Sequence, residues 1–155
     1  MFEVIVAAVD SSPRAAGVVE AAREVADRFA GVVHLFRVVT LPPEFPAAAR
    51  NSPDDLENAL RAQATRELAA LAGGHPRVIV DGPELGILEP WRAILQRARE
   101  VGAGLIVVGS HGYAGWDRIL GTTAAKVANH ADRPVLVVHQ GPEVDGSQQH
   151  GSQRR

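Results

Sequence analysis

The hydrophobic residues of this sequence fall into short, almost uniformly apolar runs, separated by longer segments that mix apolar and polar positions. The runs are Val4–Val9, Val32–Val39, Val78–Val80, Leu105–Val108 and Val135–Val138. A run with little polar interruption is typical of a strand that is buried on both faces, as in a parallel sheet. The pattern therefore predicts five strands.

Between these runs, apolar residues recur at helical spacing, which predicts a helix in each of the four connections. Ser12 is suited to the N-cap of the first helix and Pro13 to its first turn. Ser52 and Pro53 repeat this arrangement. Pro90 is expected to open the third helix, and Gly121 precedes the fourth. The apolar faces are expected to comprise Ala15, Val18, Val19, Ala22, Val25, Ala26 and Phe29; Leu56, Leu60, Ala64, Leu68 and Leu71; Trp91, Ile94, Leu95, Ala98 and Val101; and Ala124, Val127, Ala128 and Ala131.

Glycine and proline indicate where these elements end. Gly31, Gly73–Gly74 and Gly102 are predicted to end the first three helices, and Pro134 the last. The connection 40–51 is rich in proline and is expected to be an irregular loop. Gly82 and Pro83 are predicted to turn the chain, with a loop over 83–88. Residues 140–155 are polar, so we expect a domain over 1–139 and a disordered tail.

Strand and helix alternate four times before a closing strand. This order predicts an α/β fold with a parallel sheet, right-handed crossovers and helices on both faces. In such folds, ligands bind beyond the carboxyl ends of the strands, where the strand order reverses. Asp10, residues 38–40 and residues 109–112 all follow or end predicted strands. We therefore expect these three stretches to meet at one edge of the sheet.

Composition narrows the class of protein. The chain has 155 residues, no cysteine and a net charge of -2. The missing cysteines exclude disulfides and thiolate chemistry, and the charge argues against a nucleic-acid partner. The amino-terminal residues do not resemble a signal peptide, and no run approaches the ~20 apolar residues of a membrane helix. We therefore expect a cytoplasmic protein without a membrane partner. The histidines show no zinc-ligand spacing.

The strongest candidate for chemistry is the stretch around the fourth strand. Leu105–Val108 runs directly into Gly109-Ser110-His111-Gly112, and Gly121-Thr122-Thr123 follows before the last helix. Glycines allow close approach of a ligand, and the free N–H groups that begin a helix bind phosphate. The stretch lacks the Gly-Lys-Ser/Thr of a Walker loop. The alternative is that these glycines and threonines serve only the turn and the helix cap.

These residues resemble the universal stress protein family over roughly residues 1–139. The resemblance rests on Ala8-Val9-Asp10-Ser11-Ser12, on Leu105–Gly112, on Gly121-Thr122 and on Pro134–Val138. It implies a five-stranded parallel sheet in the order 3-2-1-4-5, a Rossmann-like or adenine nucleotide α-hydrolase-like fold with three layers. The sequence has Gly104 where this family usually has Asp before its fourth strand.

One branch of that family binds ATP through a Gly-x-x-Gly…Gly-Ser/Thr pattern. The sequence has this pattern, with one residue fewer between Gly112 and Gly121. The resemblance implies that ATP is the ligand, with any Mg²⁺ carried by the triphosphate. The nucleotide-binding residues that it implies are Ala8, Val9, Asp10, Val38, Val108, Gly109, Ser110, His111, Gly112, Gly121, Thr122 and Thr123.

Several of these residues have a second interpretation. Asp10 either contacts the ribose or adenine end of a nucleotide or caps the turn after the first strand. The backbone of Val38 either meets adenine or belongs to a plain strand. His111 either donates to a phosphate or faces solvent. Arg118 and Lys126 are the nearest basic residues. Arg118 either swings over the phosphates or is a solvated surface residue.

The resemblance also implies a homodimer that joins through Val135–Val138, the alternative being a strand covered by the tail. The function that we expect is that of an ATP-binding stress protein with a sensing or regulatory role and slow or no turnover. The alternatives are a nucleotide-free dimerisation or adaptor module and a slow ATP hydrolase. No general base, nucleophile or carboxylate pair can be assigned from the sequence, so no catalytic residue is predicted.

Overall fold

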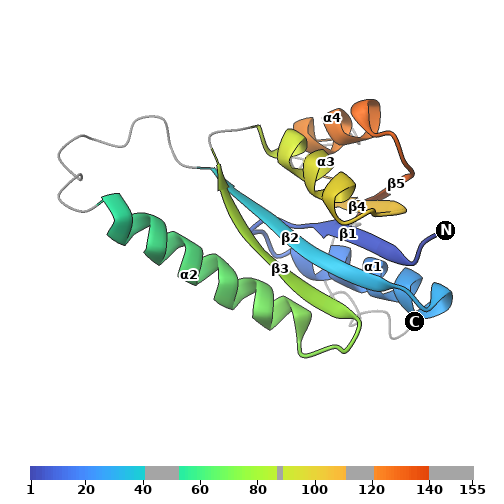
Figure 1. Ribbon diagram of the computed structural model, residues 1–155, viewed down its shortest axis with the longest axis horizontal. Helices are drawn as coiled ribbons and strands as arrows, with labels where there is room; N and C mark the ends of the chain where they lie inside the picture. Colours follow the sequence, from blue (N-terminus) through green and yellow to red (C-terminus); the bar gives the residue numbers. More distant parts are fainter. Residues whose placement is uncertain (41–52, 87–88, 111–120, 140–155) are drawn as a thin grey trace, which may run out of the picture.

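The computed structural model describes residues 1–40, 53–86, 89–110 and 121–139. Five parallel strands form one sheet in the order β3-β2-β1-β4-β5, with helices on both faces (Figure 1). The fold class and strand order are therefore as predicted. The elements are β1 (Val4–Ala8), α1 (Ala15–Phe29), β2 (Val32–Thr40), α2 (Pro53–Ala72), β3 (Val78–Gly86), α3 (Pro90–Glu100), β4 (Leu105–Gly109), α4 (Thr122–His130) and β5 (Val135–Val138).

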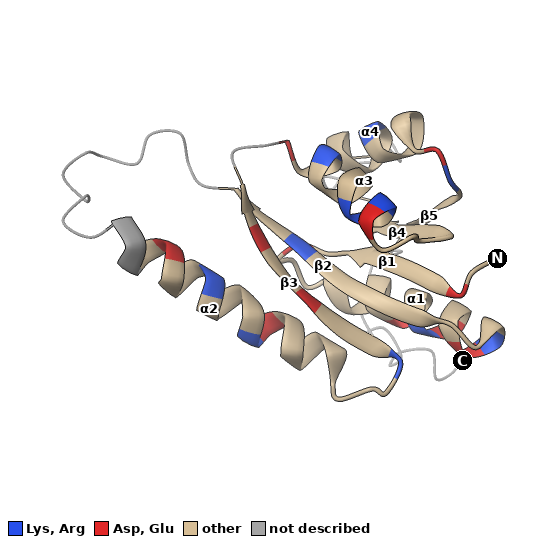
Figure 2. Cartoon of the chain, in the orientation of Figure 1, with Lys and Arg blue, Asp and Glu red and all other residues tan. Residues whose placement is uncertain are grey.

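Strand β1 is the centre of the sheet. It pairs with β2 from Val4, opposite Val32, and with β4 from Ile5, opposite Leu105. Its residues Ile5 to Ala7 are fully buried. Figure 2 shows that β1 and β4 carry no charged residue, as expected for strands covered on both faces.

Two apolar cores lie on opposite faces of the sheet. Alternate strand residues such as Ala7 and Val107 pack beneath α1 and α2, and their neighbours such as Val6 and Ile106 pack beneath α3 and α4. We call these the α1–α2 face and the α3–α4 face. Figure 1 shows the two helix pairs on either side of the sheet. The period of two along each strand divides the side chains between the cores.

The ends of α1 differ from the prediction. Ala30, not Gly31, takes the left-handed conformation after the helix, with φ of 53°. Phe29, predicted to face inward, is 50% exposed and meets Phe2 edge-on with ring centroids 5.1 Å apart. At the other end the helix begins at Ala15, and Ser12 makes no N-cap hydrogen bond. Asp10 Oδ1 instead accepts the backbone N–H of Ser12 at 2.8 Å.

Two further positions qualify the sequence prediction. Ala128 of α4, expected on the apolar face, is exposed, because the short helix covers the sheet with Ala124 and Val127. Gly104 permits close packing of the amino-terminal segment, since a Cβ at this position would lie 1.9 Å from the carbonyl oxygen of Met1.

Strand β3 is longer than predicted. The expected turn at Gly82–Pro83 and the loop from residue 83 are wrong, because the strand continues to Gly86; residues 87–88 lie outside the described part of the chain. Its register shifts from Val80 opposite Leu35 to Pro83 opposite Arg37. This bulge adds one residue to β3, and Gly82 supplies the positive φ of 65° there. An edge strand tolerates proline, which cannot donate to a neighbour.

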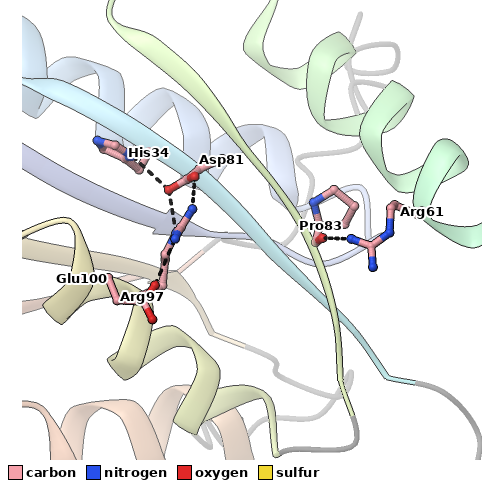
Figure 3. Close-up of polar contacts among 6 residues, drawn as sticks. All are labelled: His34, Arg61, Asp81, Pro83, Arg97 and Glu100. Atoms are coloured by element: carbon pink, nitrogen blue, oxygen red, sulfur yellow. Dashed lines mark hydrogen bonds and ion pairs between the residues drawn. The ribbon is translucent and has the colours of Figure 1, made fainter. Parts of the chain in front are cut away.

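Asp81 follows Val80, which packs on the α1–α2 face, so alternation along the strand places Asp81 on the α3–α4 face, where it joins β3 to α3. Arg97 donates to both carboxylate oxygens, its Nε to Oδ2 at 2.7 Å, and His34 Nδ1 lies 3.0 Å from Oδ2 (Figure 3). Burial alone raises the pKa of Asp81, but the hydrogen bonds from Arg97 and His34 outweigh it and hold the pKa below its ordinary value. The ionised carboxylate is therefore favoured in the folded protein.

Replacing this carboxylate tests its contribution to stability. Asp81→Asn should lower the free energy of unfolding by about 1–3 kcal/mol at pH 7, the usual range for a broken charge-assisted contact. Because the folded pKa of Asp81 is lowered, its contribution exists above the unfolded value of about 3.9 and is lost as pH falls through the folded pKa. Urea unfolding of both proteins at pH 7 and at about pH 3 should therefore show a smaller difference in acid.

The matched control is Glu24→Gln, since Glu24 pairs with Arg28 within one exposed stretch of helix α1. This variant should unfold like the parent protein at both pH values, because exposed pairs of this kind contribute little. If Asp81→Asn and the parent protein differ in free energy of unfolding by the same amount at both pH values, the role given to Asp81 is contradicted.

Candidate functional site

A cavity of about 310 Å³ lies at the carboxyl ends of β1, β2 and β4, bounded by α1, α3 and α4. It occupies the point where the strand order reverses, because β1 has β2 on one side and β4 on the other. The helix after β1 covers one face of the sheet and the helix after β4 covers the other, which leaves a crevice between them. Its wall comprises Ala8, Val9, Asp10, Ser12, Arg14, Ala15, Val18, Val38, Pro90, Ile94, Val108, Gly109, Ser110, Thr122, Thr123 and Ala124.

Most of the residues singled out from the sequence meet in this wall. They come from the ends of three strands and from the first turn of α4: Ala8, Val9, Asp10, Val38, Val108, Gly109, Ser110, Thr122 and Thr123. Gly121 is the N-cap of α4, directly before Thr122. His111 and Gly112 lie outside the described residues, as does Arg118.

Sequence reasoning did not assign the rest of the wall to the site. Ala15, Val18, Ile94 and Ala124 were expected only as core residues, because helical periodicity shows which face is buried and not what lies against it. Ser12 was expected to cap a helix, and Arg14 gave no signal. The useful clue was position, since each of these residues lies in the first turns of a helix or just before one.

One side of the cavity is apolar. Val38 at the end of β2 lies in the same wall as Pro90 and Ile94 of α3. These side chains offer no hydrogen-bonding groups and suit a flat, weakly polar ring. Ala8 and Val108 belong to the same α3–α4 face and continue the apolar wall toward the centre of the sheet.

The amino-terminal end of α4 forms another part of the wall. The helix begins at Thr122 after Gly121, which has no side chain that could cap it. Its first N–H groups therefore keep their capacity to bind an anion, and the helix dipole adds positive potential at this point. The hydroxyls of Thr122 and Thr123 lie in the same turn. This arrangement is suited to phosphate.

The turn between β1 and α1 contributes polar groups. The carboxylate of Asp10 accepts the Ser12 N–H, so the turn-capping interpretation of Asp10 has a structural basis. Asp10 also lies in the cavity wall, and so does Arg14. The hydroxyl oxygen of Ser12 is buried and has no hydrogen-bond partner among the described residues.

Helices α3 and α4 are linked beside the cavity. Lys126 of α4 donates to Glu89 Oε1 at 2.5 Å, and Trp91 Nε1 donates to Glu89 Oε2 at 2.9 Å. The hydrogen bonds from Lys126 and Trp91 lower the pKa of Glu89. The ring centroids of Trp91 and His130 are 4.6 Å apart. Lys126, named from the sequence as a nearby cation, is therefore part of this link and not of the cavity wall.

The part of the chain that the structure describes contains neither a cluster of metal-binding side chains nor a membrane-spanning helix. Its histidine, aspartate and glutamate side chains nowhere gather in threes that could hold a metal ion. None of its helices combines the length and apolar character needed to cross a membrane.

Comparison with known proteins gives a consistent picture. The model of the universal stress protein family matches residues 1–139. Universal stress protein A homolog 1 from Coxiella burnetii is 28% identical over 142 residues, covering 88% of this chain and 96% of that protein. Universal stress protein UspA from Lactobacillus plantarum is 25% identical in its solved structure, with a TM-score of 0.72 and coverage of 88% and 97%.

A further solved structure is a universal stress protein in complex with cAMP. It is 25% identical, with a TM-score of 0.61, and the similarity covers 90% of this chain and 98% of that one. The residues matched by the family model include the strand ends and the helices that form the cavity. The chain belongs to the universal stress protein family.

Proposed function

We propose that this protein binds ATP in the cavity at the strand ends, as a member of the ATP-binding branch of its family. The observation that carries the proposal is the pairing of an apolar wall with an uncapped helix terminus in one cavity. Adenine would lie against Val38, Pro90 and Ile94, and the phosphates would meet the N–H groups of α4.

Two further observations support the proposal. The cavity volume of about 310 Å³ falls within the ~300–1,000 Å³ usual for small-molecule sites. A related universal stress protein is known in complex with cAMP, which is also an adenine nucleotide. Any Mg²⁺ would arrive with the triphosphate, which supplies its oxygen ligands. The role we propose is nucleotide-dependent regulation in a cytoplasmic stress response, with slow or no turnover.

A charge at the start of α4 gives a direct test. Thr122→Glu places a carboxylate in the first helical turn, where it complements the helix dipole and should preserve folding. The same carboxylate should repel the phosphates and compete for the N–H groups. We expect isothermal titration calorimetry to show binding of ATP by the parent protein and at least a roughly tenfold loss in this variant, or about 1.4 kcal/mol.

Thr122→Gln is the matched control, because it has nearly the same shape as the Glu variant and no charge. It should bind ATP much more tightly than Thr122→Glu, and both should melt close to the parent protein. Equal ATP affinity in the Glu variant and the parent would contradict the placement of the phosphates. No heat and no thermal shift for the parent protein with ATP, ADP or AMP would instead support a nucleotide-free adaptor.

We further propose that the protein is a homodimer joined through β5. This strand ends one side of the sheet, and its Leu136 is 38% exposed. The other edge, β3, is less suited to adding a strand because it carries the bulge and Pro83. Arg61 from α2 also donates to the carbonyl oxygen of Pro83 at 3.3 Å (Figure 3).

Charge substitutions at the two edges distinguish them. Leu136→Glu should convert the dimer to monomer, because a carboxylate would be buried in the contact. Ile79→Glu is the control, since Ile79 is 46% exposed on β3 and should leave the dimer intact. Sedimentation equilibrium measures both masses. A dimeric Leu136→Glu protein, or a monomer produced by Ile79→Glu, would count against the β5 contact.

A further inference from the structure

Among the residues that the structure describes, the hydroxyl of Ser12 is an exception, because it is a buried side-chain polar group without a hydrogen-bond partner. Its oxygen is buried, and no described residue donates to it or accepts from it. Ser12 is one of the residues that line the cavity. Buried polar atoms in folded proteins nearly always have a partner, and leaving one without a partner costs free energy. Ser12 belongs to the cavity wall, and its side chain can turn about the Cα–Cβ bond into another staggered position. The hydroxyl is therefore a candidate for a contact that forms when a ligand fills the cavity and the side chain turns toward it.

The local structure explains why Ser12 is not satisfied by its own helix. A serine before a helix ordinarily caps it by accepting a backbone N–H. Here the carboxylate of Asp10 already accepts the N–H of Ser12, and α1 begins only at Ala15, after Arg14 as N-cap. The resulting turn places Ser12 in the cavity wall instead of over the N–H groups of α1.

The order of the strands indicates which part of a nucleotide would reach Ser12. Val38 ends the apolar wall on β2, Ser12 follows β1, and Gly109 ends β4 on the side of α4. Strand β1 lies between β2 and β4 in the sheet (Figure 1). A nucleotide with its base near Val38 and its phosphates at α4 must therefore carry its sugar across the end of β1.

We infer that Ser12 is a specificity-determining residue whose hydroxyl forms a hydrogen bond with a sugar hydroxyl of the bound nucleotide. This inference rests on the proposed binding of ATP, and it adds a residue that favours nucleotides carrying that sugar hydroxyl over nucleotides that lack it. A hydroxyl both donates and accepts, so it can pair with a ribose hydroxyl in either direction. Loss of that partner leaves the buried oxygen unsatisfied again, which is how a site rejects a ligand that lacks a hydroxyl.

The test combines one protein change with a change in the ligand. Ser12→Ala should weaken ATP binding about three- to tenfold, the effect of one neutral hydrogen bond. Of 2′-deoxy-ATP and 3′-deoxy-ATP, one lacks the hydroxyl that Ser12 contacts. The substitution should leave the affinity for that nucleotide unchanged. Calorimetry of both proteins with all three nucleotides gives this comparison. The ligand-free Ser12→Ala protein should melt at the same or a higher temperature than the parent, because the variant removes an unsatisfied group.

Ser11→Ala is the control, because Ser11 is exposed and is not in the cavity wall. It should bind all three nucleotides like the parent. If Ser12→Ala loses the same affinity for ATP and for both deoxynucleotides, the sugar contact is overturned. The proposed binding of ATP by the parent protein would still stand. Unchanged ATP affinity in Ser12→Ala, or a lower melting temperature without ligand, would also overturn it. A parent protein that binds none of the nucleotides would overturn the proposed function and this inference together.

Discussion

The pairing of β1 with two parallel neighbours is the constraint on which the rest of the structure depends. Parallel strands cannot be joined by a hairpin, so every connection must cross a face of the sheet. With β2 on one side of β1 and β4 on the other, the chain covers one face with α1 and α2 and the opposite face with α3 and α4. The crevice at the ends of β1 and β4 follows from this reversal and from no special sequence of its own.

The outer strands depend on ion pairs as well as on apolar packing. Arg37 of β2 pairs with Glu67 of α2, and its hydrogen bond, together with that of Gln63, lowers the pKa of Glu67. On the opposite face Asp81 of β3 pairs with Arg97 of α3. The two pairs attach the β2–β3 side of the sheet to a helix on each face. The β2–β3 side is therefore held by polar contacts as well as by apolar packing, whereas the uncharged central strands rely on apolar packing.

The cavity has different chemistry along its length, and that difference follows from which element supplies each part. Strands and helix faces contribute apolar side chains, because those residues continue the two cores. Helix ends and turns contribute polar groups, because backbone N–H groups lack partners there. A molecule with a flat ring at one end and an anion at the other matches this division. Ser12, whose hydroxyl has no partner among the described residues, follows β1, the strand between β2 and β4.

The sequence by itself determined the elements that depend on neighbouring residues. Largely apolar runs identified the five strands, and Gly121-Thr122 identified the start of α4. The strand order came with the family resemblance, which also named most of the residues now found in the cavity wall. The strands and helix starts were predictable from the residues alone, because hydrophobic period and helix-start residues act over one or two turns of chain.

Only the tertiary structure decided the features that depend on contacts between distant segments. Strand β3 continues through Pro83 because β2 pairs with it across a bulge, whereas the local sequence favours a turn. Ser12 loses its capping role because Asp10 takes its N–H and the helix begins later. The cavity joins residues from Ala8 to Ala124, which meet only after the sheet has formed. Local propensity cannot specify such meetings, because the free energy that selects them comes from packing between elements far apart in the chain.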